Sequence, residues 1–213
     1  MRQNRGLLAL FIILAVVLAD QIVKIYVKTH FYLGEDYAVT DWFRIKFIQN
    51  PGMAFGIELW SKLLLTLGRI AAVCFFVWFI IRAKALEGLR TGFLVCAALI
   101  TAGAAGNIFD CVFYGVLFDN PVPPDVAHFV SAGGGYASWF EGQVVDMLYF
   151  PLFDIELFGH RWEFFQYIFN IADSAICVGV FMLILFYTKD LSRAWDYVTG
   201  GRKAKAAERD EKA

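Results

Sequence analysis

Two aspartates stand in apolar surroundings, where an ionised side chain is costly. Asp173 lies near the start of an apolar run that continues to Tyr187, and Asp146 follows two valines a short way upstream. A charge at the centre of a membrane costs about 2.5–3.5 kcal/mol or more, so an acid in a membrane-length segment marks a functional site by default. Two carboxylates that meet at a membrane surface share a proton, which favours acid/base chemistry on a peptide bond. One carboxylate then takes a proton from water while its protonated partner polarises the carbonyl.

The elements that must position these acids are membrane-spanning helices. The chain has 213 residues, of which 59% are apolar and 18% are charged, whereas a soluble domain is about a quarter charged. Four segments reach the roughly 20 residues that cross a bilayer, namely 7–27, 63–81, 92–116 and 167–187. The first is expected to be a retained span, because its apolar stretch is longer than that of a signal peptide and no small-residue cleavage site follows.

The basic residues predict the orientation of the four spans. Twelve of the 19 lysines and arginines fall in three regions that share one side if the chain crosses four times: Arg2, Arg5, Arg82, Lys84, Arg90, Lys189, Arg193, Arg202, Lys203, Lys205, Arg209 and Lys212. Because cytoplasmic flanks carry the excess of positive charge, both termini are expected in the cytoplasm and loops 28–62 and 117–166 outside. A single four-span domain, 1–188, is then followed by a charged cytoplasmic tail, 189–213.

The two outer loops have different patterns. Segment 37–48 is rich in β-forming residues and predicts one or two short strands, and Asn50-Pro51-Gly52 predicts a turn. Segment 119–143 contains three prolines and three consecutive glycines, which predicts a loop insertion, with a lid as one interpretation. The sequence therefore predicts an all-α membrane protein, a four-transmembrane-helix bundle with a small extracytoplasmic β-sheet and a loop insertion.

Three of the spans carry polar residues at helical spacing, and the predicted orientation puts all of them at the outer ends of their helices. They are Asp20 and Lys24 in the first span, Asn107, Asp110 and Cys111 in the third, and Asn170, Asp173, Ser174 and Cys177 in the fourth. Residues three and four apart share a helix face, but polar side chains also hold membrane helices together without chemistry. For the Asp20–Lys24 ion pair, packing is the preferred interpretation. For Asn107 and Asp110 both interpretations stand, and for Asp173, which has no basic partner on its own face, function is preferred.

Other kinds of chemistry lack their patterns. No serine stands in a G-x-S-x-G sequence, no glycine pattern of a P-loop or dinucleotide site occurs, and the three histidines are scattered. The cysteines show neither a C-x-x-C pair nor metal-ligand spacing. We therefore expect no cofactor, no metal ion and no nucleic-acid partner.

Five motifs occur in an order that resembles bacterial lipoprotein signal peptidase (signal peptidase II), over residues 18–185. They are Asp20-Gln21-Ile22-Val23-Lys24, Asn50-Pro51-Gly52-Met53-Ala54-Phe55, Gly106-Asn107-Ile108-Phe109-Asp110, Gly142-Gln143-Val144-Val145-Asp146 and Phe169-Asn170-Ile171-Ala172-Asp173-Ser174. Any one of them alone is a weak signal, and the five in order on a four-span chain are specific.

The resemblance implies an intramembrane aspartic endopeptidase of the bacterial inner membrane, with Asp146 and Asp173 as its catalytic pair. Such enzymes remove the signal peptide of diacylglyceryl-modified prolipoproteins just before the lipid-bearing cysteine. The resemblance also implies contact with membrane lipids, a monomer, and an active site near the outer face. It places Asn50, Asn107, Asp110 and Asn170 around the pocket, with Asp20 and Lys24 in support.

The chain departs from the family pattern at three places. Cys111 stands where the family usually has arginine, which removes an expected polar contact, and Pro51 and Met53 vary the second motif. The segment 115–144 is longer than usual and creates a second acid, Asp119, in a similar pattern. Asp146 is preferred over Asp119 because its two preceding valines match the motif better and a proline-rich loop follows Asp119.

Two other classes of protein are alternatives to a peptidase. Paired membrane acids also serve proton or cation translocation, so a small proton- or cation-coupled transporter is the first. A transporter needs polar groups on both sides of the midplane, whereas the polar groups here are predicted at one end. A non-catalytic membrane scaffold is the second, and it leaves Asp173 unexplained.

Overall fold

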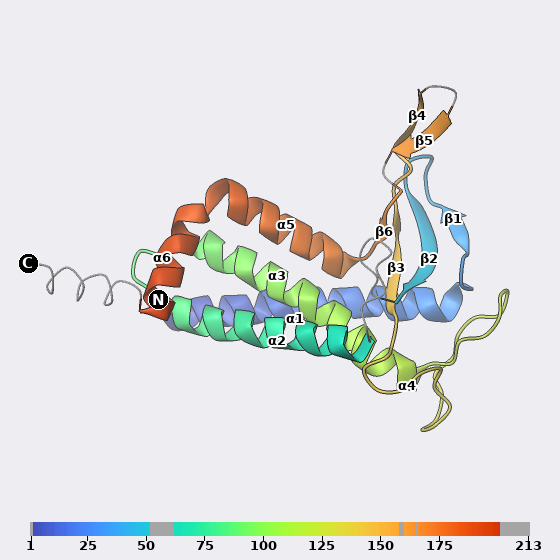
Figure 1. Cartoon of the computed structure of the whole chain (residues 1–213), viewed down its shortest axis with the longest axis horizontal. Coiled ribbons are helices and arrows are strands. Elements are labelled where there is room, and N and C mark those ends of the chain that lie inside the picture. Colours follow the sequence, from blue (N-terminus) through green and yellow to red (C-terminus); the bar gives the residue numbers. More distant parts are fainter. Residues whose placement is uncertain (1, 52–61, 158–159, 165, 201–213) are drawn as a thin grey trace, which may run out of the picture.

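The protein is mostly helical, with a small antiparallel sheet at one end of the helices (Figure 1). The computed structural model describes residues 2–51, 62–157, 160–164 and 166–200. The helices are α1 (Arg2–His30), α2 (Lys62–Ala83), α3 (Thr91–Phe109), a π-helical turn (Asp110–Tyr114), α4 (Gly115–Leu117), α5 (Ile171–Phe186) and α6 (Thr188–Thr199). The strands are β1 (Asp36–Ala38), β2 (Arg44–Asn50), β3 (Val144–Tyr149), β4 (Phe153–Leu157), β5 (His160–Phe164) and β6 (Ile168–Phe169). The predicted fold class, a helical membrane bundle with a small sheet, is confirmed.

The helices account for three membrane spans, or four if α5 and α6 form one bent span. Segments Asn4–His30, Lys62–Ala83 and Thr91–Leu117 are each long and apolar enough to cross a bilayer. The fourth is shorter, because α5 has 16 residues and meets α6 at an angle of 94°. Figure 1 shows α6 and the start of α1 at the end of the bundle opposite the sheet.

The predicted fourth span, 167–187, begins before the helix does, and the first part of the predicted tail, 189–213, is helical. Strand β6 occupies Ile168–Phe169, and α5 begins only at Ile171 because Asn170 caps it. Beyond a break at Tyr187 the chain continues as α6, which is anchored to the start of α3 by a hydrogen bond of 2.7 Å from Arg90 Nε to Asp190 Oδ2. Residues 201–213 of the predicted tail lie outside the described part.

Small residues allow α3 to pack closely against α5. A Cβ atom added at Gly103 would lie 2.1 Å from the carbonyl oxygen of Ala172, and one at Gly106 would lie 2.8 Å from Asp20 Oδ2. Cβ atoms essentially never come this close to another atom, so a larger residue would have to displace the backbone of α5 at position 103 and the carboxylate of Asp20 at position 106. Helix α3 also packs against α1 and α2 and is therefore the centre of the bundle.

The main sheet has the order β1-β2-β3-β6, with antiparallel neighbours throughout. Strands β1 and β2 confirm the strands predicted in 37–48. Strand β3 lies between β2 and β6 and carries Asp146, which pairs with Ile48. Strands β4 and β5 form a separate hairpin. Segment 119–143 has neither helix nor strand, apart from single bridges between Tyr32 and Val126 and between Phe118 and Phe129.

Candidate active site

Asp173 is fixed at the N-terminus of α5 by a reciprocal cap. Asn170 Oδ1 accepts a hydrogen bond of 2.9 Å from the backbone N–H of Asp173, and Asp173 Oδ2 accepts one of 3.3 Å from the N–H of Asn170. Asparagine is among the preferred N-cap residues, and the positive end of the helix dipole favours a carboxylate in the first turn. The acid is therefore placed by the helix start itself, and its side chain is half-buried.

Asp146 reaches the same place from the sheet. Its side chain on β3 is buried, and its carboxylate accepts hydrogen bonds from Asn50 Nδ2 at 3.1 Å and from Asn170 Nδ2 at 2.6 Å. Burial and, second, the nearby charge of Asp173 together raise the pKa of Asp146 to about 7, although the two hydrogen bonds act in the opposite direction. At neutral pH this carboxyl group is therefore close to half-protonated.

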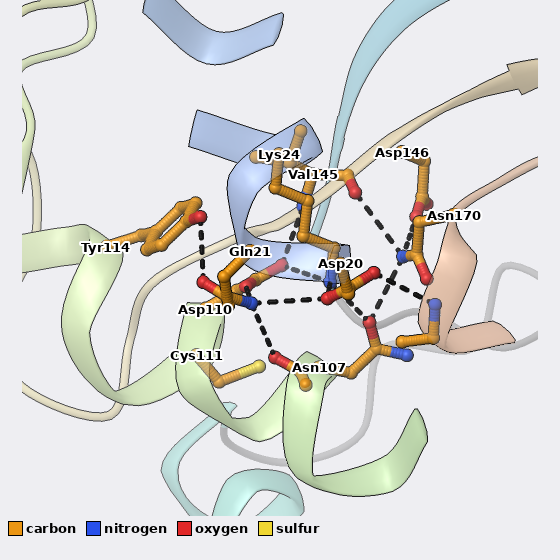
Figure 2. A network of polar contacts seen from close by, with 12 residues as sticks. Asp20, Gln21, Lys24, Asn107, Asp110, Cys111, Tyr114, Val145, Asp146 and Asn170 are labelled. Atoms are coloured by element: carbon orange, nitrogen blue, oxygen red, sulfur yellow. Dashed lines mark hydrogen bonds and ion pairs between the residues drawn. The ribbon is translucent and has the colours of Figure 1, made fainter. Parts of the chain in front are cut away.

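Two asparagines connect the two carboxyl groups. Asn107 Nδ2 donates to Asp173 Oδ1 at 2.8 Å, and Asn107 Oδ1 accepts from Asn170 Nδ2 at 3.1 Å. Since Asn170 also donates to Asp146, the chain of contacts runs from one aspartate to the other through side-chain amides alone. Figure 2 shows the part of this chain that joins Asp146, Asn170 and Asn107. The structure thus brings together β2, β3, α3 and α5, whose sequence motifs were predicted to meet.

A buried ion network supports this centre from α1 and α3. Lys24 Nζ lies 2.9 Å from Asp20 Oδ2, 2.8 Å from Asp110 Oδ2 and 2.8 Å from Asn107 Oδ1. The side chains of Lys24, Asp20 and Asp110 are fully buried. Buried charges are tolerated when they are paired and hydrogen-bonded, and here three acceptors meet the three N–H groups of one ammonium. The predicted Asp20–Lys24 ion pair is present, with Asp110 as a third member.

Each supporting acid holds the backbone beside one of the two site aspartates. Asp20 Oδ1 accepts a hydrogen bond of 2.9 Å from the N–H of Ala172, the residue before Asp173. Asp110 Oδ2 accepts one of 3.2 Å from the N–H of Val145, the residue before Asp146. Lys24 joins the two supporting acids, so α1 and α3 together fix both strand β3 and the start of α5.

The contacts of two residues, Gln21 and Arg69, were missed by reasoning from the sequence. Gln21 donates to Asp110 Oδ1 at 2.8 Å and accepts from the hydroxyl group of Tyr114 at 3.0 Å (Figure 2). Its position three residues before Lys24, on the same face of α1, was a signal that could have found it. Arg69 donates to Cys111 Sγ at 3.3 Å. No local spacing connects these two residues, because they lie 42 positions apart on different helices.

One acid and one thiol considered in the sequence lie outside this centre. Asp119, the second candidate acid, is partly exposed in the loop after α4 and accepts from the N–H of His128 at 2.7 Å. Cys177 is exposed on α5. In the part of the chain that the structure describes, no group of three or more His, Cys, Asp or Glu side chains is placed to hold a metal ion.

The fold and this centre define a helical, membrane-embedded protein with two aspartates at the meeting point of a sheet and a helix start. A solved bacterial membrane enzyme, determined by the in meso method, has the same fold: the TM-score is 0.58 at 25% identity, with 83% of this chain and 90% of that chain covered.

Sequence comparison gives the family. The family described as signal peptidase (SPase) II matches residues 12–189. The lipoprotein signal peptidase of Porphyromonas gingivalis is 43% identical in an alignment of 202 positions that covers 91% of this chain and 88% of that protein. That of Amoebophilus asiaticus is 34% identical in an alignment of 186 positions that covers 82% of this chain and 75% of that protein. The chain belongs to the signal peptidase II family and is thereby a peptidase.

Proposed function

We propose that this protein is an intramembrane aspartic endopeptidase that removes the signal peptide of diacylglyceryl-modified prolipoproteins just before the lipidated cysteine. Family membership supports the peptidase activity, and the relatives named as lipoprotein signal peptidases support the substrate class. The observation that carries the aspartic mechanism is the connection of Asp146 to Asp173 through Asn170 and Asn107. Two carboxyl groups held this way can share one proton.

We infer the two roles from the environment of Asp146. This side chain is buried, and its raised pKa of about 7 favours the protonated form, so we give it the role of proton donor and Asp173 that of the base. Asp173 therefore takes a proton from water as the water oxygen attacks the scissile carbonyl carbon. Asp146 gives its proton to the carbonyl oxygen. Asp173 then protonates the leaving nitrogen, and Asp146 recovers a proton from the tetrahedral diol as the C–N bond breaks.

The topology that fits this reaction is the one expected from the basic residues. Both termini and the tail 189–213 lie in the cytoplasm, and the sheet, Asp146 and Asp173 lie near the outer face of the bacterial inner membrane. The sheet that carries Asp146 lies at the end of the bundle opposite α6 and the start of α1 (Figure 1), which supports a site and termini on opposite sides of the membrane. Domain 1–188 then acts as a single monomeric unit in contact with membrane lipids.

The test is cleavage of a lipidated prolipoprotein peptide by the purified enzyme in lipid. Asp146→Asn and Asp173→Asn each remove one acid from the pair, so each should lower kcat about 10²–10⁴-fold, the usual contribution of a positioned acid or base. Asp119→Asn is the matched control and should cleave normally, because Asp119 lies outside the network. Wild-type kcat in either of the first two variants would end the proposal. Ion flux in proteoliposomes without cleavage would favour the transporter alternative.

A further inference from the structure

Lys28 is a buried cation of an unusual kind. Its side chain is fully buried on α1, and its Nζ has no hydrogen-bond partner among the residues that the structure describes. Lys24, one turn earlier on the same helix, makes three such contacts. An ammonium group without acceptors is costly to bury, and an apolar side chain of similar volume would fill the same space at no such cost. Packing alone therefore does not explain why a lysine occupies this buried position.

Three aromatic rings surround the ammonium group. Nζ lies 5.8 Å from the ring centroid of Phe47, 5.4 Å from that of Phe118 and 5.1 Å from that of Tyr136. Each distance is within the range of a cation–π contact. The rings come from β2, from the end of α4 and from segment 119–143, so one cation connects three separate parts of the sheet end. We call this group the Lys28 cage.

Phe47 connects the cage to the strand pairing beside Asp146. Ile45 pairs with Leu148 and Ile48 with Asp146, so two residues of β2 lie opposite one residue of β3. This is a β-bulge, a device that redirects side chains and is frequent beside active sites. The backbone of Phe47 turns away from β3 and exchanges hydrogen bonds of 2.9 Å with Gly34 and Glu35. Holding the Phe47 ring therefore holds the bulge next to Asp146.

Tyr136 connects the cage to the beginning of β3. Its hydroxyl oxygen accepts a hydrogen bond of 2.7 Å from the backbone N–H of Gln143, the residue before the strand. Its own N–H donates to the carbonyl of Phe118 at 3.0 Å. The cage thus contacts the β3 region at two places: through Tyr136 at Gln143, the residue directly before the strand, and through Phe47 at the bulge next to the pair formed by Ile48 and Asp146. Segment 119–143 takes part in these contacts through Tyr136. A freely moving lid would not be fixed to the sheet in this way.

We propose that Lys28 is a positioning residue that aims Asp146 for the peptidase reaction. The ammonium group holds Phe47 and Tyr136, which fix the register and the start of β3, and β3 carries the acid. This inference rests on the proposed function, since it needs Asp146 to react. It goes beyond that function because Lys28 itself touches neither Asp146 nor Asp173.

Lys28→Met tests the role of the cation, since methionine fills the volume and removes the charge. We expect kcat for a lipidated peptide to fall about 10- to 100-fold, as for a displacement of a catalytic group by about 1 Å. We expect KM to stay within twofold of the parent and Tm to stay equal or rise. Lys28→Arg keeps a cation over the rings and should retain more activity than Lys28→Met.

Lys46→Met is the matched control, because Lys46 lies in the same bulge with its Nζ 5.4 Å from the ring of Tyr149 but with a side chain 37% exposed. It should leave kcat unchanged. Phe118→Leu keeps the lysine and removes one ring, and it should lower kcat in the same direction as Lys28→Met.

Two results would overturn the inference: a kcat of Lys28→Met within twofold of the parent, or a fall in kcat matched by a fall in Tm, which would indicate a packing role only. Failure of the proposed function would be distinguishable, because Asp146→Asn would then cleave normally.

Discussion

Lys24 and Lys28 allow one substitution to be compared in two environments one helical turn apart. Both side chains are fully buried on α1. Lys24→Met removes the cation between Asp20 and Asp110, whereas Lys28→Met removes a cation with no acceptor among the described residues. Breaking a buried ion pair costs about 3–5 kcal/mol because it leaves charge uncompensated. Removing a buried charge that has no hydrogen-bond acceptor also removes its desolvation penalty, so we expect that substitution to be neutral or stabilising. The two substitutions should therefore affect stability differently: Lys24→Met should lower Tm, whereas Lys28→Met should leave it unchanged or raise it.

The loss of stability expected for Lys24→Met depends on the hydrogen-bond donors that Asp20 and Asp110 still have without the lysine. Asp20 retains the N–H of Ala172 and Asp110 retains the N–H of Val145, so neither acid is stripped of donors. What is lost is the compensation of charge, and we expect a loss of about 3–5 kcal/mol. At about 2–4 °C per kcal/mol for a chain of this size, Tm should fall by about 6–20 °C.

The assay is thermal unfolding in lipid-containing micelles, followed by tryptophan fluorescence at one lipid concentration for the parent and both variants. The expected order of Tm is Lys24→Met lowest, with Lys28→Met at or above the parent. A fall of less than about 3 °C for Lys24→Met, or equal falls for both variants, would refute the claim that pairing decides the energy of these buried cations.

Two further predictions concern packing and pH. Gly103→Ala should destabilise the bundle by several kcal/mol, because its Cβ would lie 2.1 Å from a backbone oxygen of α5, while Gly68→Ala on α2, with nothing within 4 Å, should leave Tm unchanged or raise it slightly. For Asp146 the folded pKa of about 7 exceeds the unfolded value of about 3.9. Its contribution to stability is therefore full below pH 4 and is lost as pH rises to about 7, on the order of 4 kcal/mol, and Asp146→Asn should remove this slope in denaturant titrations.

The parts of the fold that depend on local pattern were predictable from the sequence. The spans follow from apolar length, and the stripes of polar residues follow from helical spacing, which is why Asp20 and Lys24 meet as expected. The start of α5 was also readable, since Asn170 and Asp173 have the spacing of a reciprocal cap directly before an apolar run. The predicted start at residue 167 ignored that signal.

The parts that depend on distant pairing were not predictable in this way. Asp146 is buried because β3 pairs with β2, almost a hundred positions earlier, and no local periodicity specifies that register or its bulge. The cage around Lys28 is formed by rings from three segments that are distant in the sequence. From the sequence alone, a single lysine near the end of a span is interpreted as a residue at the membrane interface. The contact of Arg69 with Cys111 likewise depends on the packing of α2 against the π-helical turn.

The ion network explains why the bundle centre is polar at all. Apolar residues of similar volume at Asp20, Lys24 and Asp110 would pack as well and would remove the desolvation penalty. They could not accept the N–H groups of Ala172 and Val145, which precede the two site aspartates. Because Lys24 lies between both acceptors, a shift of α1 moves the backbone beside Asp146 and Asp173 together. The charged residues inside the bundle therefore fix the position of Asp146, on β3, relative to that of Asp173, on α5.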